Sequence, residues 1–137
     1  MKIRKSLLSI VTVTFMLFTA CSSEAQNAKE SQTKSTSSEI EIIQFHSENR
    51  CMTCQKIETL TQKTLKDYSA IPFSLVNVDD AKNEKKAEEF EAYGTALFLY
   101  NPKTNKKKNL TEFAFMTAGN EEKFIAELKK EIDEFSK

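Results

Sequence analysis

Residues 40–56 read IEIIQFHSENRCMTCQK, and this stretch decides the fold. Residues 40–45 are mostly apolar and rich in β-branched side chains, which predicts a buried strand. Cys51 and Cys54 follow, at the start of a segment over 51–68 whose apolar positions recur every three or four residues. That spacing predicts a helix with one buried face. The stretch therefore predicts a strand that leads into a helix with a CxxC pair at its N-terminus.

The remaining residues up to 137 divide into further strands and helices. We expect a strand over 73–78, a helix from Asp79 and Asp80 to Tyr93 that Gly94 ends, a central strand over 96–100, a strand over 110–115 and a helix capped by Asn120. Residues 101–109, with Pro102 and four lysines, are expected to form an exposed turn. The order β-α-β-α-β-β-α predicts an α/β domain with a mixed four-stranded sheet. Its first three strands would be parallel, its last two would form a hairpin, and helices would cover both faces.

The N-terminal residues predict an export signal rather than part of this domain. Three basic residues (Lys2, Arg4 and Lys5) precede an apolar run over 7–18, which is too short to span a bilayer comfortably. The run ends in LFTAC, which resembles a bacterial lipoprotein signal although Phe18 stands where Leu is usual. We expect residues 1–20 to be cleaved and Cys21 to be lipidated; the alternative is an ordinary secreted protein with a spare thiol.

Residues 21–38 are expected to form a linker after the lipidated cysteine, because 22–38 contain no aromatic or large aliphatic side chain. Residues 39–137 then form one small domain. Export places the protein in the bacterial cell envelope, anchored to a membrane by lipid and facing the periplasm, where disulfides persist. Without its signal the chain has 17 basic and 20 acidic residues, which gives no case for a nucleic-acid partner. We expect a monomer.

The spacing of Cys51 and Cys54 favours chemistry over structural cross-linking, because a disulfide stabilises more when it closes a longer loop. The unpaired N–H groups at a helix N-terminus and the neighbouring Arg50 both favour the thiolate of Cys51. Cys54 lies one turn further, on the apolar face, and should be more buried. Cys51 is therefore the expected attacking thiol, and Cys54 the thiol that resolves the mixed disulfide. A redox-silent pair or half of a metal site is the alternative.

Two nearby residues have more than one interpretation. His46 is the only histidine; it could support the Cys51 thiolate or bind a metal, but a solvated loop histidine is the ordinary interpretation. Met52 could meet a partner or bind Cu(I), or it could be an ordinary apolar residue of the motif. A single CxxC supplies only two of the four ligands that zinc usually takes, so we expect no zinc site and no cofactor.

This order, with a CxxC opening the first helix, resembles the thioredoxin fold over essentially all of residues 39–137. The matching pieces are residues 42–45 (IIQF), 51–56 (CMTCQK) and 77–79 (NVD). The chain is especially similar to small lipoproteins of Bacteroidetes-type bacteria that are sometimes grouped as a nitrophenyl-compound nitroreductase subunit family. The resemblance implies a three-layer α/β/α sandwich and exchange with protein or small-molecule thiols and disulfides. It does not imply nitroreduction, because nothing in the sequence resembles a flavin or nicotinamide site.

Three positions depart from the thioredoxin pattern. Thr95 falls where thioredoxins carry a cis-proline, and Gln44 falls where they bury an acidic residue. Leu75 falls where they carry the lysine that partners that acid. These departures predict a slower reductase and an altered docking surface.

The leading hypothesis is a membrane-anchored, extracytoplasmic thiol–disulfide oxidoreductase that uses Cys51 and Cys54. One alternative is a copper metallochaperone, with His46 or Met52 as a further ligand. Another is a thioredoxin-fold binding or electron-relay subunit with no turnover of its own.

Overall fold

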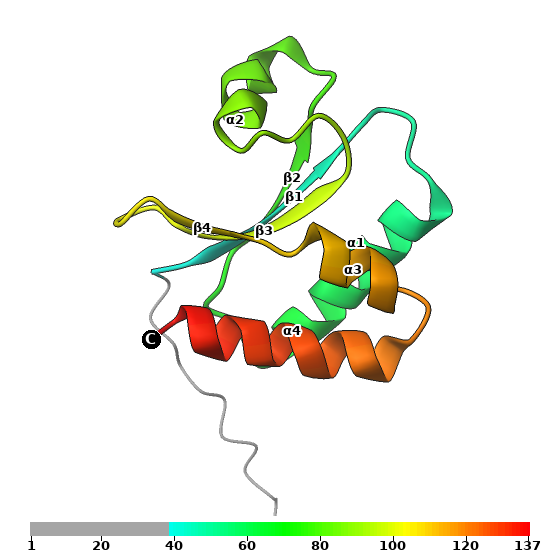
Figure 1. Cartoon of the computed structure of the whole chain (residues 1–137), viewed down its shortest axis with the longest axis vertical. Coiled ribbons are helices and arrows are strands. Elements are labelled where there is room, and N and C mark those ends of the chain that lie inside the picture. Colours follow the sequence, from blue (N-terminus) through cyan, green and yellow to red (C-terminus); the bar gives the residue numbers. More distant parts are fainter. Residues whose placement is uncertain (1–38) are drawn as a thin grey trace, which may run out of the picture. The chain divides into compact units, whose positions relative to one another are not determined.

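The sheet at the centre of the fold has four strands in the order β2-β1-β3-β4 (Figure 1). The computed structural model describes residues 39–137. The strands are β1 (Glu41–His46), β2 (Phe73–Asn77), β3 (Ala96–Asn101) and β4 (Lys106–Asn109). β2 runs parallel to β1, whereas β3 is antiparallel to both β1 and β4. The expected α/β class and mixed four-stranded sheet are confirmed.

Four α-helices accompany this sheet within the described residues. They are α1 (Met52–Thr64), α2 (Glu84–Glu89), α3 (Thr111–Thr117) and α4 (Glu121–Phe135). A short 3₁₀ turn, Leu65–Asp67, extends α1, and another, Ala81–Asn83, precedes α2. α1, α3 and α4 lie on one side of the sheet, and α2 lies on the other (Figure 1).

Apolar clusters on the two faces of the sheet hold these layers together. Successive side chains of β1 point to opposite faces of the sheet. Ile42 lies on the face under α1, α3 and α4, and Ile43 and Phe45 lie on the opposite face. The first cluster joins the sheet to the buried faces of three helices; it includes Ile57, Leu60, Leu97, Leu99, Phe124, Leu128 and Ile132. On the second face, Phe45, Phe90 and Phe98 contact one another with ring centroids 5.2–5.8 Å apart. Elements on both faces therefore hold β1 at the centre of the sheet.

The expectation that the first three strands are parallel was wrong, because β3 runs opposite to β1. Phe45, near the end of β1, pairs with Ala96 at the start of β3, whereas β1 and β2 end side by side at His46 and Asn77. The helix between β2 and β3 has only 6 residues, which span about 9 Å. After this helix, β3 starts at the edge of the sheet where β2 ends, so the chain does not return along the sheet before β3 begins.

The strand expected over 110–115 was also wrong. The fourth strand is the lysine-rich Lys106–Asn109, and Thr111–Thr117 forms α3. Leu110, Ala114, Thr117 and Ala118 are all buried, at a spacing that puts them on one face of a helix. The exposed turn is correspondingly shorter than expected and ends at Asn105, whose φ is 56°. Asparagine tolerates this left-handed conformation better than most residues.

The bounds of two other helices refine the expectations. α2 ends at Glu89, well before Gly94, and Asp80 caps the 3₁₀ turn ahead of it by accepting a hydrogen bond from the Lys82 N–H. α4 starts as expected: Asn120 caps it by accepting a hydrogen bond from the Lys123 N–H at 3.1 Å.

The expectations of an export signal, a lipidated Cys21 and a linker fall on residues 1–38, outside the described part of the chain. Within residues 39–137, no helix is both long enough and apolar enough to cross a bilayer.

Candidate functional site

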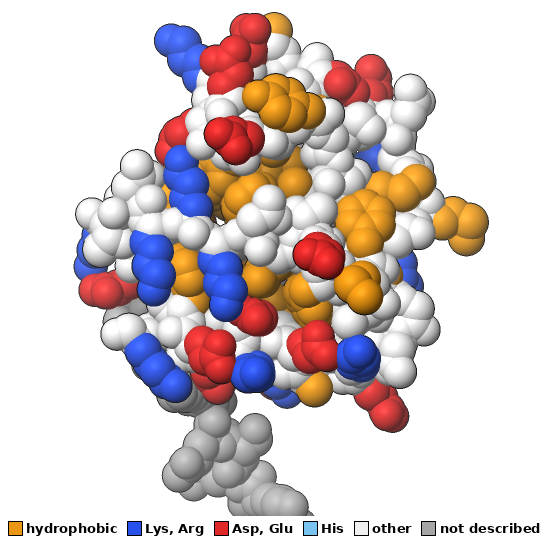
Figure 2. Space-filling view, in the orientation of Figure 1, with side chains coloured by type: hydrophobic (Ala, Val, Ile, Leu, Met, Phe, Trp, Pro, Cys, Tyr) orange, Lys and Arg blue, Asp and Glu red, His pale blue; other side chains and the backbone are white. Residues whose placement is uncertain are grey.

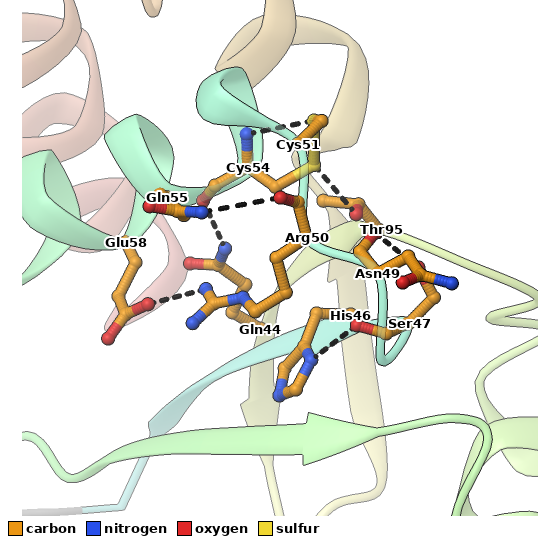
Figure 3. Close-up of a disulfide and its surroundings, with 10 residues drawn as sticks. All are labelled: Gln44, His46, Ser47, Asn49, Arg50, Cys51, Cys54, Gln55, Glu58 and Thr95. Carbon is orange, nitrogen blue, oxygen red and sulfur yellow. Dashed lines mark hydrogen bonds and ion pairs between the residues drawn. A yellow bond between two sulfur atoms is a disulfide. The ribbon is translucent and has the colours of Figure 1, made fainter.

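Cys51 and Cys54 form a disulfide at the N-terminal end of α1, a few residues after β1 ends (Figure 3). Cys51 is the N-cap of the helix, and its Sγ accepts a hydrogen bond from the Cys54 backbone N–H at 3.2 Å. Its carbonyl oxygen accepts another from the Gln55 N–H at 3.1 Å. The Cys51 sulfur therefore lies where the helix presents its unpaired N–H groups, which favour negative charge.

The two cysteines differ in exposure, as the position of Cys54 on the apolar face predicts. Cys51 is exposed, whereas Cys54 is 4% exposed. An incoming thiolate can therefore reach Cys51 but not Cys54. Attack on Cys51 would make Cys54 the leaving group, inside the protein.

Gln44 on β1 lies beneath Cys54 and is completely buried. Its side-chain Nε2 donates a hydrogen bond to the Cys54 carbonyl oxygen at 2.9 Å, and its Oε1 has no hydrogen-bond partner within residues 39–137. Leu75 is its direct neighbour on β2 and is 41% exposed. The polar group behind the disulfide is thus an amide that carries no charge.

Thr95 approaches the disulfide from the segment before β3. Its hydroxyl donates a hydrogen bond to Cys54 Sγ at 3.0 Å (Figure 3). The side chain is only partly buried, so it lies between the protein interior and solvent. Of the supporting residues predicted from the sequence, Thr95 has a direct bond to a reacting sulfur.

Arg50 and His46 make other contacts. The Arg50 side chain runs from the disulfide toward Glu58, with which it forms an ion pair (Figure 3). His46 contacts its chain neighbour, with Nδ1 2.9 Å from the Ser47 carbonyl oxygen. Both residues therefore border the site, but their bonded partners are Glu58 and Ser47.

A groove with apolar side chains lies at the start of α1, next to Cys51 in the chain. Met52 is 88% exposed, and with Phe115 it lines a groove of about 450 Å³ between the start of α1 and the end of α3. The groove is also lined by Thr53, Lys56, Ala118 and Gly119. Figure 2 shows apolar side chains gathered at the right of the view, over α1 and α3. Phe115 was not predicted at this site because residues 110–115 were expected to form a strand; the helical spacing from Leu110 to Ala118 was the available signal.

Within residues 39–137, no cluster of three or more His, Cys, Asp or Glu side chains is arranged to hold a metal ion.

Comparison with known proteins adds little to this geometry. No family model matches the chain, and no curated protein matches it. Among solved structures, the chain is similar to one titled "Structure of a malarial protein", with 23% identity and a TM-score of 0.41. The match covers 57% of this chain and 93% of that one. At this TM-score the similarity carries no conclusion about fold or function.

Proposed function

We propose that this protein is a thiol–disulfide oxidoreductase with a thioredoxin-like domain and that Cys51 and Cys54 are its redox pair. The observation that carries the proposal is the disulfide at the start of α1, with one sulfur exposed and the other buried. A disulfide between residues only three apart constrains the unfolded chain less than one that closes a long loop. An accessible sulfur on a helix N-terminus is instead suited to exchange.

The order of the strands supports a thioredoxin-like architecture. The unit β1-α1-β2 carries both cysteines, with β1 and β2 parallel, and β3 and β4 add an antiparallel hairpin on the other side of β1. Helices on both faces of this sheet agree with a three-layer sandwich.

The bonds and electrons of the exchange balance between the two cysteines and a partner dithiol. A partner thiolate attacks Cys51 Sγ, the Cys51–Cys54 bond breaks, and Cys54 leaves as a thiolate. The partner's second thiolate then attacks its own sulfur in the mixed disulfide and releases Cys51. The partner loses two electrons and the protein gains two; the reverse sequence reduces a partner disulfide. The relative reduction potentials set the direction.

The surroundings of Cys51 favour a protein segment over a small thiol as the physiological partner. Met52, which follows Cys51 in the chain, is exposed and lines an apolar groove together with Phe115. Burial of that surface would stabilise a complex with an unfolded or extended polypeptide. Small thiols and disulfides remain competent in the exchange itself.

The trapping experiment tests the proposal on the full chain. Arg50 and Lys56 bracket the pair, so trypsin releases residues 51–56 as one peptide, free of Cys21. We expect Cys54→Ala to accumulate mixed disulfides through Cys51 and the control Cys51→Ala to accumulate few. If the Cys51–Cys54 pair of the wild-type chain stays oxidised at every accessible reduction potential, the proposal is wrong.

An electron-relay subunit without turnover of its own is the second candidate, and the amide of Gln44 in place of a buried acid favours it. This candidate predicts a reversible disulfide together with negligible reduction of insulin. A protein with a reversible disulfide that also reduces insulin is the oxidoreductase; one with a reversible disulfide and negligible insulin reduction is the relay subunit.

We also propose that the chain is a lipoprotein of the bacterial cell envelope, anchored through Cys21. Labelled fatty acid should enter the wild-type chain and not Cys21→Ser. Equal labelling of both would contradict the anchor.

A further inference from the structure

The buried sulfur of Cys54 is contacted by a hydroxyl rather than by an ionisable group. Thr95 Oγ1 donates to it at 3.0 Å. The basic side chains near Cys54 in the chain have partners elsewhere. Lys56 pairs with Glu121 and Arg50 pairs with Glu58, while His46 contacts Ser47. Gln44 reaches the Cys54 backbone carbonyl, and as an amide it takes no part in proton transfer. Within residues 39–137, the side-chain group that donates a hydrogen bond to Cys54 Sγ is therefore the Thr95 hydroxyl.

We propose that Thr95 is a catalytic residue whose hydroxyl stabilises the Cys54 thiolate as it leaves the disulfide. This inference rests on the proposed exchange function. In the oxidised protein the hydroxyl donates to a neutral sulfur, which is a weak acceptor. When the bond breaks, the same sulfur carries a full negative charge, and hydrogen bonds to charged acceptors are about twice as strong as neutral ones. A contact that strengthens as charge develops lowers the barrier.

The electrons balance in this step without a proton transfer. The electron pair of the partner thiolate forms the new bond to Cys51 Sγ. The pair from the broken Cys51–Cys54 bond moves to Cys54 Sγ, where the Thr95 hydroxyl donates to it. Thr95 keeps its proton throughout.

A direction of redox bias follows from the same contact. Stabilisation of the Cys54 thiolate favours the reduced protein over the oxidised one, so it makes the disulfide a stronger oxidant. Thr95 would therefore have a chemical role at the position where thioredoxins carry a cis-proline. We expect the residue to promote oxidation of partner dithiols.

The test uses the full chain and compares Thr95→Val, which removes the hydroxyl and keeps a branched side chain, with Thr95→Ser, which keeps the hydroxyl. Thr59→Ala is the matched control, because Thr59 is an exposed α1 residue whose hydroxyl bonds to the Gln55 carbonyl. The rate of disulfide reduction by excess dithiothreitol is followed by alkylation and mass spectrometry. We expect Thr95→Val to be about tenfold slower, the size of effect that one charge-assisted hydrogen bond can produce. Thr95→Ser and Thr59→Ala should stay near wild type.

A second measurement separates chemistry from packing. In a Cys51→Ser background, the pH midpoint for alkylation of Cys54 should be higher in the Thr95→Val variant than with the native threonine, and Thr95→Ser should restore it. Thr95→Ala supplies a second hydroxyl-free variant if valine disturbs the loop. Unchanged rates and midpoints in both hydroxyl-free variants would overturn the inference, as would a Thr95→Ser variant as slow as Thr95→Val. If the wild-type disulfide itself does not exchange with dithiothreitol, the proposed function fails instead.

Discussion

Gln44 and Cys54 are joined by a buried hydrogen bond between strand and helix, from the Gln44 side-chain Nε2 to the Cys54 carbonyl oxygen at 2.9 Å. The bond fixes the first turn of α1 over the end of β1 without placing a charge beneath the disulfide. Because Gln44 is fully buried, any group that replaces its amide would also be shielded from water.

Gln44→Glu should make stability depend on pH. Burial would raise the pKa of the new carboxyl above its unfolded value. The stability of the variant would therefore be retained below the unfolded pKa and lost as pH rises through the raised folded value. We expect a loss of about 1–3 kcal/mol at neutral pH, the usual penalty for a buried group without its hydrogen bond. Urea unfolding across pH measures this. The exposed α1 residue Gln62, changed to Glu, is the control, and an equal response of both variants would contradict the prediction.

Tyr68 should give stability a second dependence on pH, in the alkaline range. Burial, and then the neighbouring Asp133, raise the pKa of Tyr68 to about 12; its hydroxyl donates to Asp133 Oδ1 at 3.3 Å. Because the folded value lies above the unfolded one, this contribution is fully present below about pH 10 and is lost as pH rises toward the folded value.

Tyr68→Phe should therefore be less stable than wild type by about 1 kcal/mol at neutral pH. The difference should shrink as pH rises through the alkaline range, since phenylalanine has no proton to lose. Thermal unfolding between about pH 8 and 11, on either side of the ordinary tyrosine pKa, tests this. Tyr93→Phe, at a position 85% exposed, is the control. A difference between Tyr68→Phe and wild type that stays constant with pH would argue against the assignment.

Arg50 should matter more to stability than to exchange. Its guanidinium pairs with Glu58, and both side chains are about one-fifth exposed, so its charge is largely compensated before it can act on Cys51. We expect Arg50→Met to destabilise the fold by up to about 1 kcal/mol and to change the dithiothreitol rate by less than about threefold. Lys63→Met, on the helix that carries Glu58, is the control for loss of a surface charge. A tenfold slower exchange in Arg50→Met alone would restore the direct role expected from the sequence.

The groove lined by Met52 and Phe115 should distinguish protein partners from small ones. We expect Phe115→Ser to raise the KM for a reduced or unfolded protein substrate several-fold, because it removes apolar contact area, while the dithiothreitol rate stays unchanged. Met116→Ser is the matched control, since Met116 is also exposed on α3 but does not line the groove. If the two variants have the same KM, the groove is not the docking surface.

The sequence predicts best where one periodicity dominates. The first strand, the helix that follows it and the burial of Cys54 all come from local apolar spacing, and Asn120 marks the start of α4 through its own side-chain bond. The segment around Leu110 was ambiguous because its apolar residues fit both a short strand and a helix.

The lysine-rich strand β4 has almost no apolar alternation, so its sequence does not predict a strand. Backbone pairing with β3 at the edge of the sheet holds it in place. The bond from Thr95 to Cys54 joins residues 41 positions apart. No local pattern encodes such a contact. From the sequence, Thr95 stood out only as a departure from the thioredoxin proline. The bond of its hydroxyl to Cys54 is a tertiary contact that the structure shows.

The antiparallel direction of β3 has a consequence for reactivity. Because β3 runs antiparallel to β1, it begins beside the end of β1, and Thr95, one residue before β3, lies at the disulfide. In a parallel arrangement the same threonine would lie a strand length away, about 17–20 Å from the sulfur. The direction of one strand thus decides which side chain meets Cys54, so the reactivity of the pair depends on sheet topology as well as on the two cysteines themselves.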